Sequence, residues 1–156
     1  MIFIPDHCDL ILAGKKTQTR RLVKPDDKLR SLPGWLHRRI WYVNGKGNRL
    51  KWIEGENYAI QRSRSKPAEG RFRLLEIRKE QLQQITVEDV EAEGVNVVAA
   101  MPALVKPGTT KEQLDTLALM LAHRLFGELW DSINSKAGTR WTDNPAVWVL
   151  EFELAN

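Results

Sequence analysis

The segment Ile11-Leu-Ala-Gly-Lys-Lys-Thr-Gln-Thr-Arg-Arg21 marks a change from helix to strand near the start of the 156-residue chain. Residues 5–13 before it predict a short helix with Leu10 and Ile11 buried. Gly14 ends that helix, because glycine adopts the left-handed conformation of a helix C-terminus at little cost. From residue 17 to 23, apolar or β-branched residues alternate with polar ones, which predicts a half-buried strand.

The rest of the chain predicts a meander of short strands with helices between them. Residues 57–62 and 71–79 are strand candidates joined by a turn. Thr86 opens a capping box that predicts a helix to Glu93, ending at Gly94. The remaining expected elements are a connector at 95–110, a core-packing helix at 111–134, a turn at 141–145 and a terminal strand at 147–154.

Residues 25–54 form a basic, Trp-rich insert that is expected to be a long loop or hairpin. Its tryptophans at 35, 41 and 52 are interleaved with Arg and Lys, a composition that suits single-stranded nucleic acid. A surface hairpin with inward-packed tryptophans is the other interpretation. Residues 1–80 carry 19 Lys/Arg against 9 Asp/Glu, whereas residues 81–156 carry 5 against 11, so a polyanion would meet the first half.

Composition favours one globular domain over residues 1–156, with 42% hydrophobic and 28% charged residues. No apolar run approaches the roughly 20 residues that span a bilayer, and no signal peptide is evident. The single cysteine, Cys8, agrees with a reducing compartment, so a cytoplasmic location is expected. Cys8, His7, His37 and His123 lack metal-ligand spacing, and no cofactor is expected.

The segment at 11–21 resembles the signature of the ASCH domain family of the PUA-like group, an apolar helix ending in glycine followed by Lys-Thr-x-Thr-x-Arg. The resemblance covers residues 1–23, about 55–95 and 122–154, and leaves the insert outside. It implies an α+β fold, a PUA-like small mixed β-barrel with packed helices. Within the family, the segment is similar to that of small bacterial N(4)-acetylcytidine amidohydrolases.

Position by position, the resemblance implies a catalytic set of Lys16, Thr19 and Glu93. Amide hydrolysis needs a nucleophile, a base and an acid, and these roles suit Thr19, Lys16 and Glu93 respectively. Burial and neighbouring cations would lower the pKa of the lysine. Residues three apart on a regular strand face opposite sides, so Lys16 and Thr19 converge only if the chain bends between residues 14 and 17.

The expected substrate is a modified cytidine nucleoside or a related small molecule. Arg21, which closes the motif, either binds it or pairs with Glu76 or Glu93, and Lys15 is a second candidate. The candidates for stacking on the base are Trp41, Trp52, Tyr58 and Trp141. Two alternative functions stay open: a module that binds single-stranded RNA, with Arg38 and Arg39 as contacts, and a metal-dependent single-strand ribonuclease.

Overall fold

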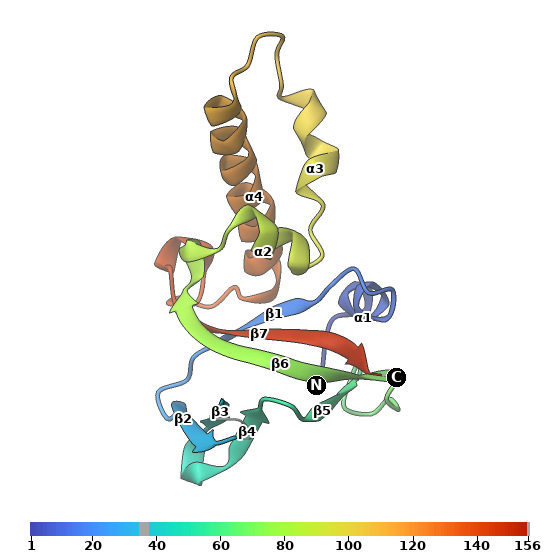
Figure 1. The fold of residues 1–156 in the computed structure, drawn as a ribbon, viewed down its shortest axis with the longest axis vertical. Helices are drawn as coiled ribbons and strands as arrows, with labels where there is room; N and C mark the ends of the chain where they lie inside the picture. Colours follow the sequence, from blue (N-terminus) through green and yellow to red (C-terminus); the bar gives the residue numbers. More distant parts are fainter. Residues whose placement is uncertain (35–37, 156) are drawn as a thin grey trace.

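A computed structural model describes residues 1–34 and 38–155 of the chain (Figure 1). Its main sheet has the strand order β1-β7-β6-β5, and all neighbouring strands are antiparallel. The strands are β1 (Gln18–Leu22), β5 (Asn57–Ile60), β6 (Gly70–Gln81) and β7 (Ala146–Ala155). With helices packed on this sheet, the expected α+β class is confirmed.

The central strand β7 is buried on both faces, which explains its nearly continuous apolar sequence. Val147 and Val149 pack with the helices, whereas Trp148 and Leu150 pack on the opposite side. Its partner β6 keeps the same alternation only through a register shift between Leu74 and Glu76. Such a bulge turns a side chain to the other face and increases the local twist.

The insert is a second sheet rather than a loop or a single hairpin. Strands β2 (Lys28–Pro33), β3 (Arg39–Asn44) and β4 (Leu50–Ile53) pair antiparallel in the order β2-β3-β4, with a 3-10 turn η2 (Lys46–Asn48) between the last two. Val43 is fully buried against Leu74 and Trp148 of the main sheet. This apolar contact makes the insert part of the core of the main sheet and overrides its loop-like composition. Trp35 and His37 lie outside the described residues.

The described strands do not close into the expected barrel. They form two antiparallel sheets, and the parallel pairing among the described residues is an isolated bridge between Ile2 and Gln61. Glu54 connects the sheets, because its carboxylate accepts hydrogen bonds from the backbone of Trp41 in β3 and of Ile77 in β6, both at 3.0 Å. This side chain links the two sheets, next to the backbone hydrogen bonds that Gly55 and Glu56 make with Leu74 of β6.

A second connection to the insert is made by Asp27. Its carboxylate accepts two hydrogen bonds from Lys51 of β4, at 2.7 and 2.8 Å, and one from the indole nitrogen of Trp148, at 3.0 Å. Burial alone would raise the pKa of Asp27, but the hydrogen bonds from Lys51, the Lys24 backbone and Trp148 lower it overall.

The helices that follow β6 lie on the opposite side of the main sheet from the insert, whereas the first helix packs on Phe72 and Phe152, next to the end of β7 (Figure 1). The helices are α1 (Pro5–Leu12), α2 (Val87–Ala92), α3 (Val97–Ala100) and α4 (Lys111–Ile133), with 3-10 turns η3 (Leu82–Gln84), η4 (Met101–Ala103) and η5 (Trp141–Asp143). As expected, Thr86 caps α2 by accepting a hydrogen bond from Asp89. None of the described helices is long and apolar enough to traverse a bilayer.

Two expectations for the second half of the chain need correction. The connector at 95–110 contains α3, which begins where Asn96 accepts a hydrogen bond from the backbone of Ala99. The helix α4 is buried only from Leu121 onward, and its first half extends away from the sheets beside α3 (Figure 1). Apolar spacing predicted the helix correctly, but it does not tell which turns meet the core.

Replacing Asp27 with alanine is expected to lower the free energy of unfolding by about 2–3 kcal/mol, because it leaves Lys51 and the Trp148 indole without their acceptor. Asp26→Ala is the matched control, since Asp26 is exposed and adjacent, and it should change stability by less than about 0.5 kcal/mol. Urea unfolding followed by tryptophan fluorescence measures both. Equal stabilities for the two variants would contradict the role given to Asp27.

Candidate functional site

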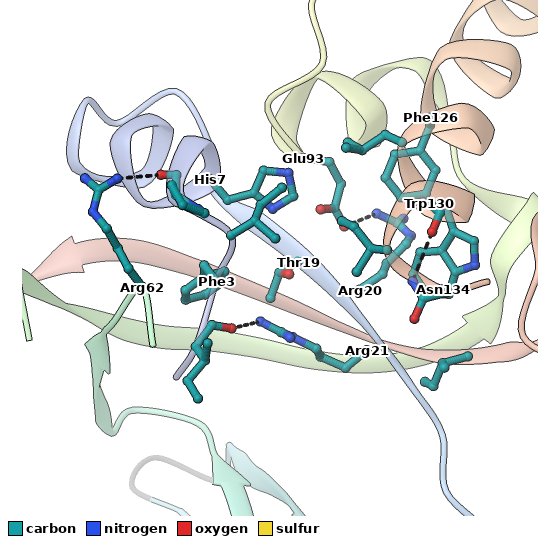
Figure 2. Close-up of a pocket in the computed structure, with 16 residues that line it drawn as sticks. Phe3, His7, Thr19, Arg20, Arg21, Arg62, Glu93, Phe126, Trp130 and Asn134 are labelled. Atoms are coloured by element: carbon teal, nitrogen blue, oxygen red, sulfur yellow. Dashed lines mark hydrogen bonds and ion pairs between the residues drawn. The ribbon is translucent and has the colours of Figure 1, made fainter. Parts of the chain in front are cut away.

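A cavity of about 390 Å³ lies between the start of the chain, β1 and the C-terminal half of α4 (Figure 2). Its polar lining includes Thr19, Glu93 and His7. Three aromatic residues, Phe3, Phe126 and Trp130, also line it, and each is nearly fully buried. The other lining residues are Ile2, Ile4, Pro5, Arg20, Arg21, Leu22, Arg62, Leu129, Ile133 and Asn134.

The chain bends between α1 and β1 and so brings Lys16 to Glu93. Gly14 has φ +68°, and the amides of Lys15 and Lys16 both donate to the carbonyl of Leu10, at 2.8 and 3.1 Å. The next amide, that of Thr17, donates to Ala92 of α2 at 2.8 Å. The expected bend is therefore present, and it places the segment against the end of α2.

Lys16 and Glu93 form a buried ion pair. The ammonium of Lys16 bonds to one carboxylate oxygen of Glu93 and donates to the Glu93 backbone carbonyl at 2.8 Å. Gly94 follows with φ +91°, and a Cβ there would lie 2.8 Å from Leu10. A glycine is therefore required where α2 ends, and this fixes the approach of Glu93 to Lys16.

The second carboxylate oxygen of Glu93 accepts a hydrogen bond from Arg20, at 3.1 Å. The Arg20 side chain is completely buried, and it also pairs with Glu80 at 2.7 Å and Asp89 at 2.9 Å. The arginine that pairs with Glu93 is therefore Arg20, and not Arg21 as the sequence analysis allowed. The motif does not indicate this role for Arg20, although the alternation of β1 places it on the side of Gln18, which bonds to Asp89.

The electrostatics of this cluster follow from its burial. Burial lowers the pKa of the Lys16 ammonium, and the adjacent Glu93 carboxylate opposes that shift. For Asp89, burial alone would raise the pKa, but hydrogen bonds from Gln18 and the charges of Arg20 and Arg78 lower it overall. The Glu93 carboxylate at the cavity wall is thus held from behind by a lysine that gives up its proton more readily than usual.

Thr19 and Arg21 both line the cavity from β1. Thr19 is buried and lies in the middle of the view in Figure 2, between His7, Glu93 and Arg21, and its hydroxyl makes no hydrogen bond to the described residues. Arg21 donates to the backbone carbonyl of Ile2 at 2.8 Å, and its guanidinium lies 5.0 Å from the ring centre of Phe3. Of the predicted site residues, the structure brings Thr19, Glu93 and Arg21 to the cavity wall and Lys16 directly behind it.

His7, which the motif did not indicate, also lines the cavity. Burial, and then the charge of Lys16, lower its pKa from 6.5 to about 4. The imidazole is therefore neutral at physiological pH and can accept or donate a hydrogen bond. His7 lies on the first turn of α1, four residues before Ile11, and residues four apart lie on the same side of a helix. This spacing is the signal by which the sequence could have linked His7 to the motif.

None of the aromatic residues expected to stack on a base lines the cavity. Trp41 and Trp52 belong to the insert, which packs on the other side of the main sheet. Tyr58 stacks on Phe72 and accepts the amide of Ile53, and Trp141 packs beside Gly127. Lys15 is exposed and does not line the cavity either. The rings that do line it belong to Phe3 and to Phe126 and Trp130, which are four residues apart on α4. This spacing points to a site only once it is known which face of α4 borders the cavity.

Among residues 1–34 and 38–155, no group of three or more His, Cys, Asp or Glu side chains is arranged to hold a metal ion. The acidic residues of the site instead pair with Lys16, Arg20 and Arg78.

Comparisons with known proteins give a likeness of fold at low identity. No protein-family model matches the chain, and no curated protein matches it. The crystal structure of an ASCH domain from Lactobacillus crispatus is 15% identical with a TM-score of 0.47, and the match covers 96% of this chain and 70% of that one. A protein from Enterococcus faecalis, described by the family model DUF984, is 13% identical with a TM-score of 0.48, covering 95% of this chain and 66% of that one. At these identities the likeness concerns the fold and says nothing about a reaction.

The low pKa of His7 makes the stability of the protein depend on pH in a predictable direction. An unfolded histidine takes up a proton near pH 6.5, whereas folded His7 does so only near pH 4, so stability is lost as the pH falls through this range. As the pH falls from 7 to 4, the free energy of unfolding of His7→Gln should decrease by roughly 1–2 kcal/mol less than that of the parent, after allowance for the partial exposure of His7.

Urea unfolding at several pH values measures this difference. Acidic groups with lowered pKa, such as Asp89, also weaken the fold in acid, but they contribute equally to both proteins. Parallel curves for the parent and His7→Gln would show that His7 is not buried as described.

Proposed function

We propose that the chain is an amidohydrolase that removes the acyl group from N(4)-acylcytosine nucleosides such as N(4)-acetylcytidine. The observation that carries this proposal is the buried Lys16–Glu93 pair beside the free hydroxyl of Thr19, at the wall of a cavity with aromatic sides. A volume of about 390 Å³ falls within the range of small-molecule sites. The resemblance to acetylcytidine amidohydrolases, carried by residues 11–21 and by the helix that ends at Glu93, implies the same three residues.

The proposed reaction begins with attack of the Thr19 hydroxyl oxygen on the acyl carbon. The hydroxyl proton passes to the Glu93 carboxylate, which Lys16 and Arg20 hold in place through its two oxygens. The bond between the acyl carbon and N4 then breaks, and Glu93 returns a proton to the departing amine of cytosine. Water hydrolyses the acyl ester on Thr19, which releases the carboxylic acid and restores the hydroxyl.

The contacts of Glu93 suit this division of roles. Lys16 bonds to Glu93 and not to Thr19, whereas the Glu93 carboxylate lines the cavity. Glu93 is therefore the proton-carrying group that meets the substrate, and Lys16 acts through it. Arg20 holds the other carboxylate oxygen and fixes its orientation. Catalytic hydrogen bonds often form fully only when the substrate is bound.

Release of cytidine from N(4)-acetylcytidine, followed by chromatography, tests the proposal. Thr19→Ala should lower kcat/KM by about 10³-fold or more, because it removes the nucleophile and leaves every charge in place. Thr142→Ala is the matched control, since Thr142 is exposed and outside the cavity, and it should keep the parent activity. Turnover by Thr19→Ala at the rate of the parent, or no turnover by the parent, would reject the proposal.

Glu93→Gln separates proton transfer from nucleophilic attack. It keeps the shape of the side chain but removes the proton carrier, so a loss of about 10²- to 10⁴-fold in kcat is expected. Thermal unfolding of the same preparation must show a folded protein, because the change leaves Lys16 and Arg20 with fewer charged acceptors. A folded Glu93→Gln protein with the kcat of the parent would exclude Glu93 as the acid.

A further inference from the structure

A second hollow, with a volume of about 910 Å³, adjoins the cavity on the insert side. Ile2 and Arg21 line both hollows, so the two meet at these residues. We call the second hollow the basic groove. Six basic side chains and two acidic ones line it: Arg21, Lys24, Lys46, Arg49, Lys51 and Arg64, with Asp26 and Asp27.

The acidic residues neutralise little of this charge. Asp27 is already occupied by Lys51 and by the Trp148 indole. Within the described part of the chain, no ion pair involves Lys24, Lys46, Arg49 or Arg64, the basic side chains that remain besides Arg21. A row of unpaired cations with one free carboxylate creates a positive potential that attracts anions.

Arg21 is the residue at which the groove and the cavity meet. Its Nε atom is buried and has no hydrogen-bond partner among the described residues. No described carboxylate forms an ion pair with its guanidinium, which makes one hydrogen bond to a backbone carbonyl. A buried donor without an acceptor is costly, and an anion at this position would satisfy it.

We propose that the basic groove binds the phosphate of a nucleotide whose base occupies the cavity, so that the substrate is a phosphate-bearing acylcytosine rather than a free nucleoside. The identity of the base rests on the proposed function, whereas phosphate binding rests on the groove alone. In a nucleotide, one sugar separates the base from the phosphate. The cavity and the groove are adjacent, because Ile2 and Arg21 line both, so one nucleotide would place its base in the first and its phosphate in the second.

The form of the groove favours a nucleotide over other anions. A cavity with aromatic walls accepts a flat ring, and a line of Lys and Arg beside it follows a phosphate backbone. Trp52 adds an aromatic ring to the groove, with the Lys51 ammonium 4.5 Å from the ring centre. The shared chemistry is a phosphate ester next to the base, whether in a mononucleotide or within single-stranded RNA.

Binding is measured by isothermal titration calorimetry in a Thr19→Ala background, so that turnover does not consume the ligands. The probes are N(4)-acetylcytidine, its 5′-monophosphate, and a five-nucleotide RNA with N(4)-acetylcytidine at its centre. Each probe is titrated into the Thr19→Ala protein, which is the parent in this experiment, and into the same protein with Lys46→Ala/Arg49→Ala, the groove variant. The control, Lys111→Ala/Arg124→Ala, removes the same two residue types from exposed positions of α4 outside the groove.

The proposal predicts that a phosphate-bearing probe binds at least tenfold more tightly than the nucleoside, and that the groove variant loses this advantage while the control keeps it. For RNA, loss of two phosphate contacts should reduce the slope of log K against log salt by about 1.4. A gain for the monophosphate indicates a single phosphate site, whereas a gain for the RNA alone indicates contact with the chain of phosphates.

Equal binding of all three probes by the parent, or equal binding by the groove variant and the control, would overturn the proposal. The proposed hydrolase function fails separately. RNA binding that the groove variant weakens, combined with no release of acetate from any probe by the protein with Thr19 intact, would retain the groove as a phosphate site and reject the hydrolase.

Discussion

The buried cluster of Lys16, Glu93 and Arg20 is the constraint on which the rest of the site depends. Two cations occupy the two oxygens of one carboxylate, and all three side chains are shielded from water. Burying any of these charges alone would cost several kcal/mol, so each position is tolerable only while the others are in place. The cluster thereby joins the start of β1 to the end of α2 and to Glu80 of β6.

The same constraint determines what the cavity can do. Lys16 lies behind Glu93, and Arg20 holds the second carboxylate oxygen at the cavity wall, so that the carboxylate lies beside the hydroxyl of Thr19. His7 stays neutral at the same wall, since burial and the charge of Lys16 disfavour its protonation. In the proposed reaction, Thr19 supplies the nucleophile and Glu93 carries the proton.

Local signals in the sequence predicted the elements that hold the site, and long-range packing decided the rest. Gly14 and the Thr86 capping box indicated where α1 ends and where α2 begins, and both lie where expected. The composition of the insert indicated a loop, because nothing local shows that Val43 will be buried against the main sheet. The open arrangement of the two sheets likewise depends on Glu54, whose partners are distant in sequence.

In the candidate site too, local sequence patterns identified some residues, and long-range packing determined the others. The motif named Lys16, Thr19 and Arg21, and the helix end named Glu93, because these residues follow a linear pattern. The role of Arg20 depends on its distant partners Glu80, Asp89 and Glu93, and the aromatic wall depends on which face of α4 borders the cavity. The expected stacking residues were chosen because they are aromatic and near basic residues, and this choice could not tell which face of the main sheet the insert would cover.

A crystal structure of the Thr19→Ala variant with N(4)-acetylcytidine tests the central claim most directly. The account predicts that the base lies between Phe3 and the Phe126 side of the cavity, with its acetyl carbonyl at position 19 and N4 within hydrogen-bond reach of the Glu93 carboxylate. A ligand bound elsewhere, or an N4 atom directed away from Glu93, would contradict it.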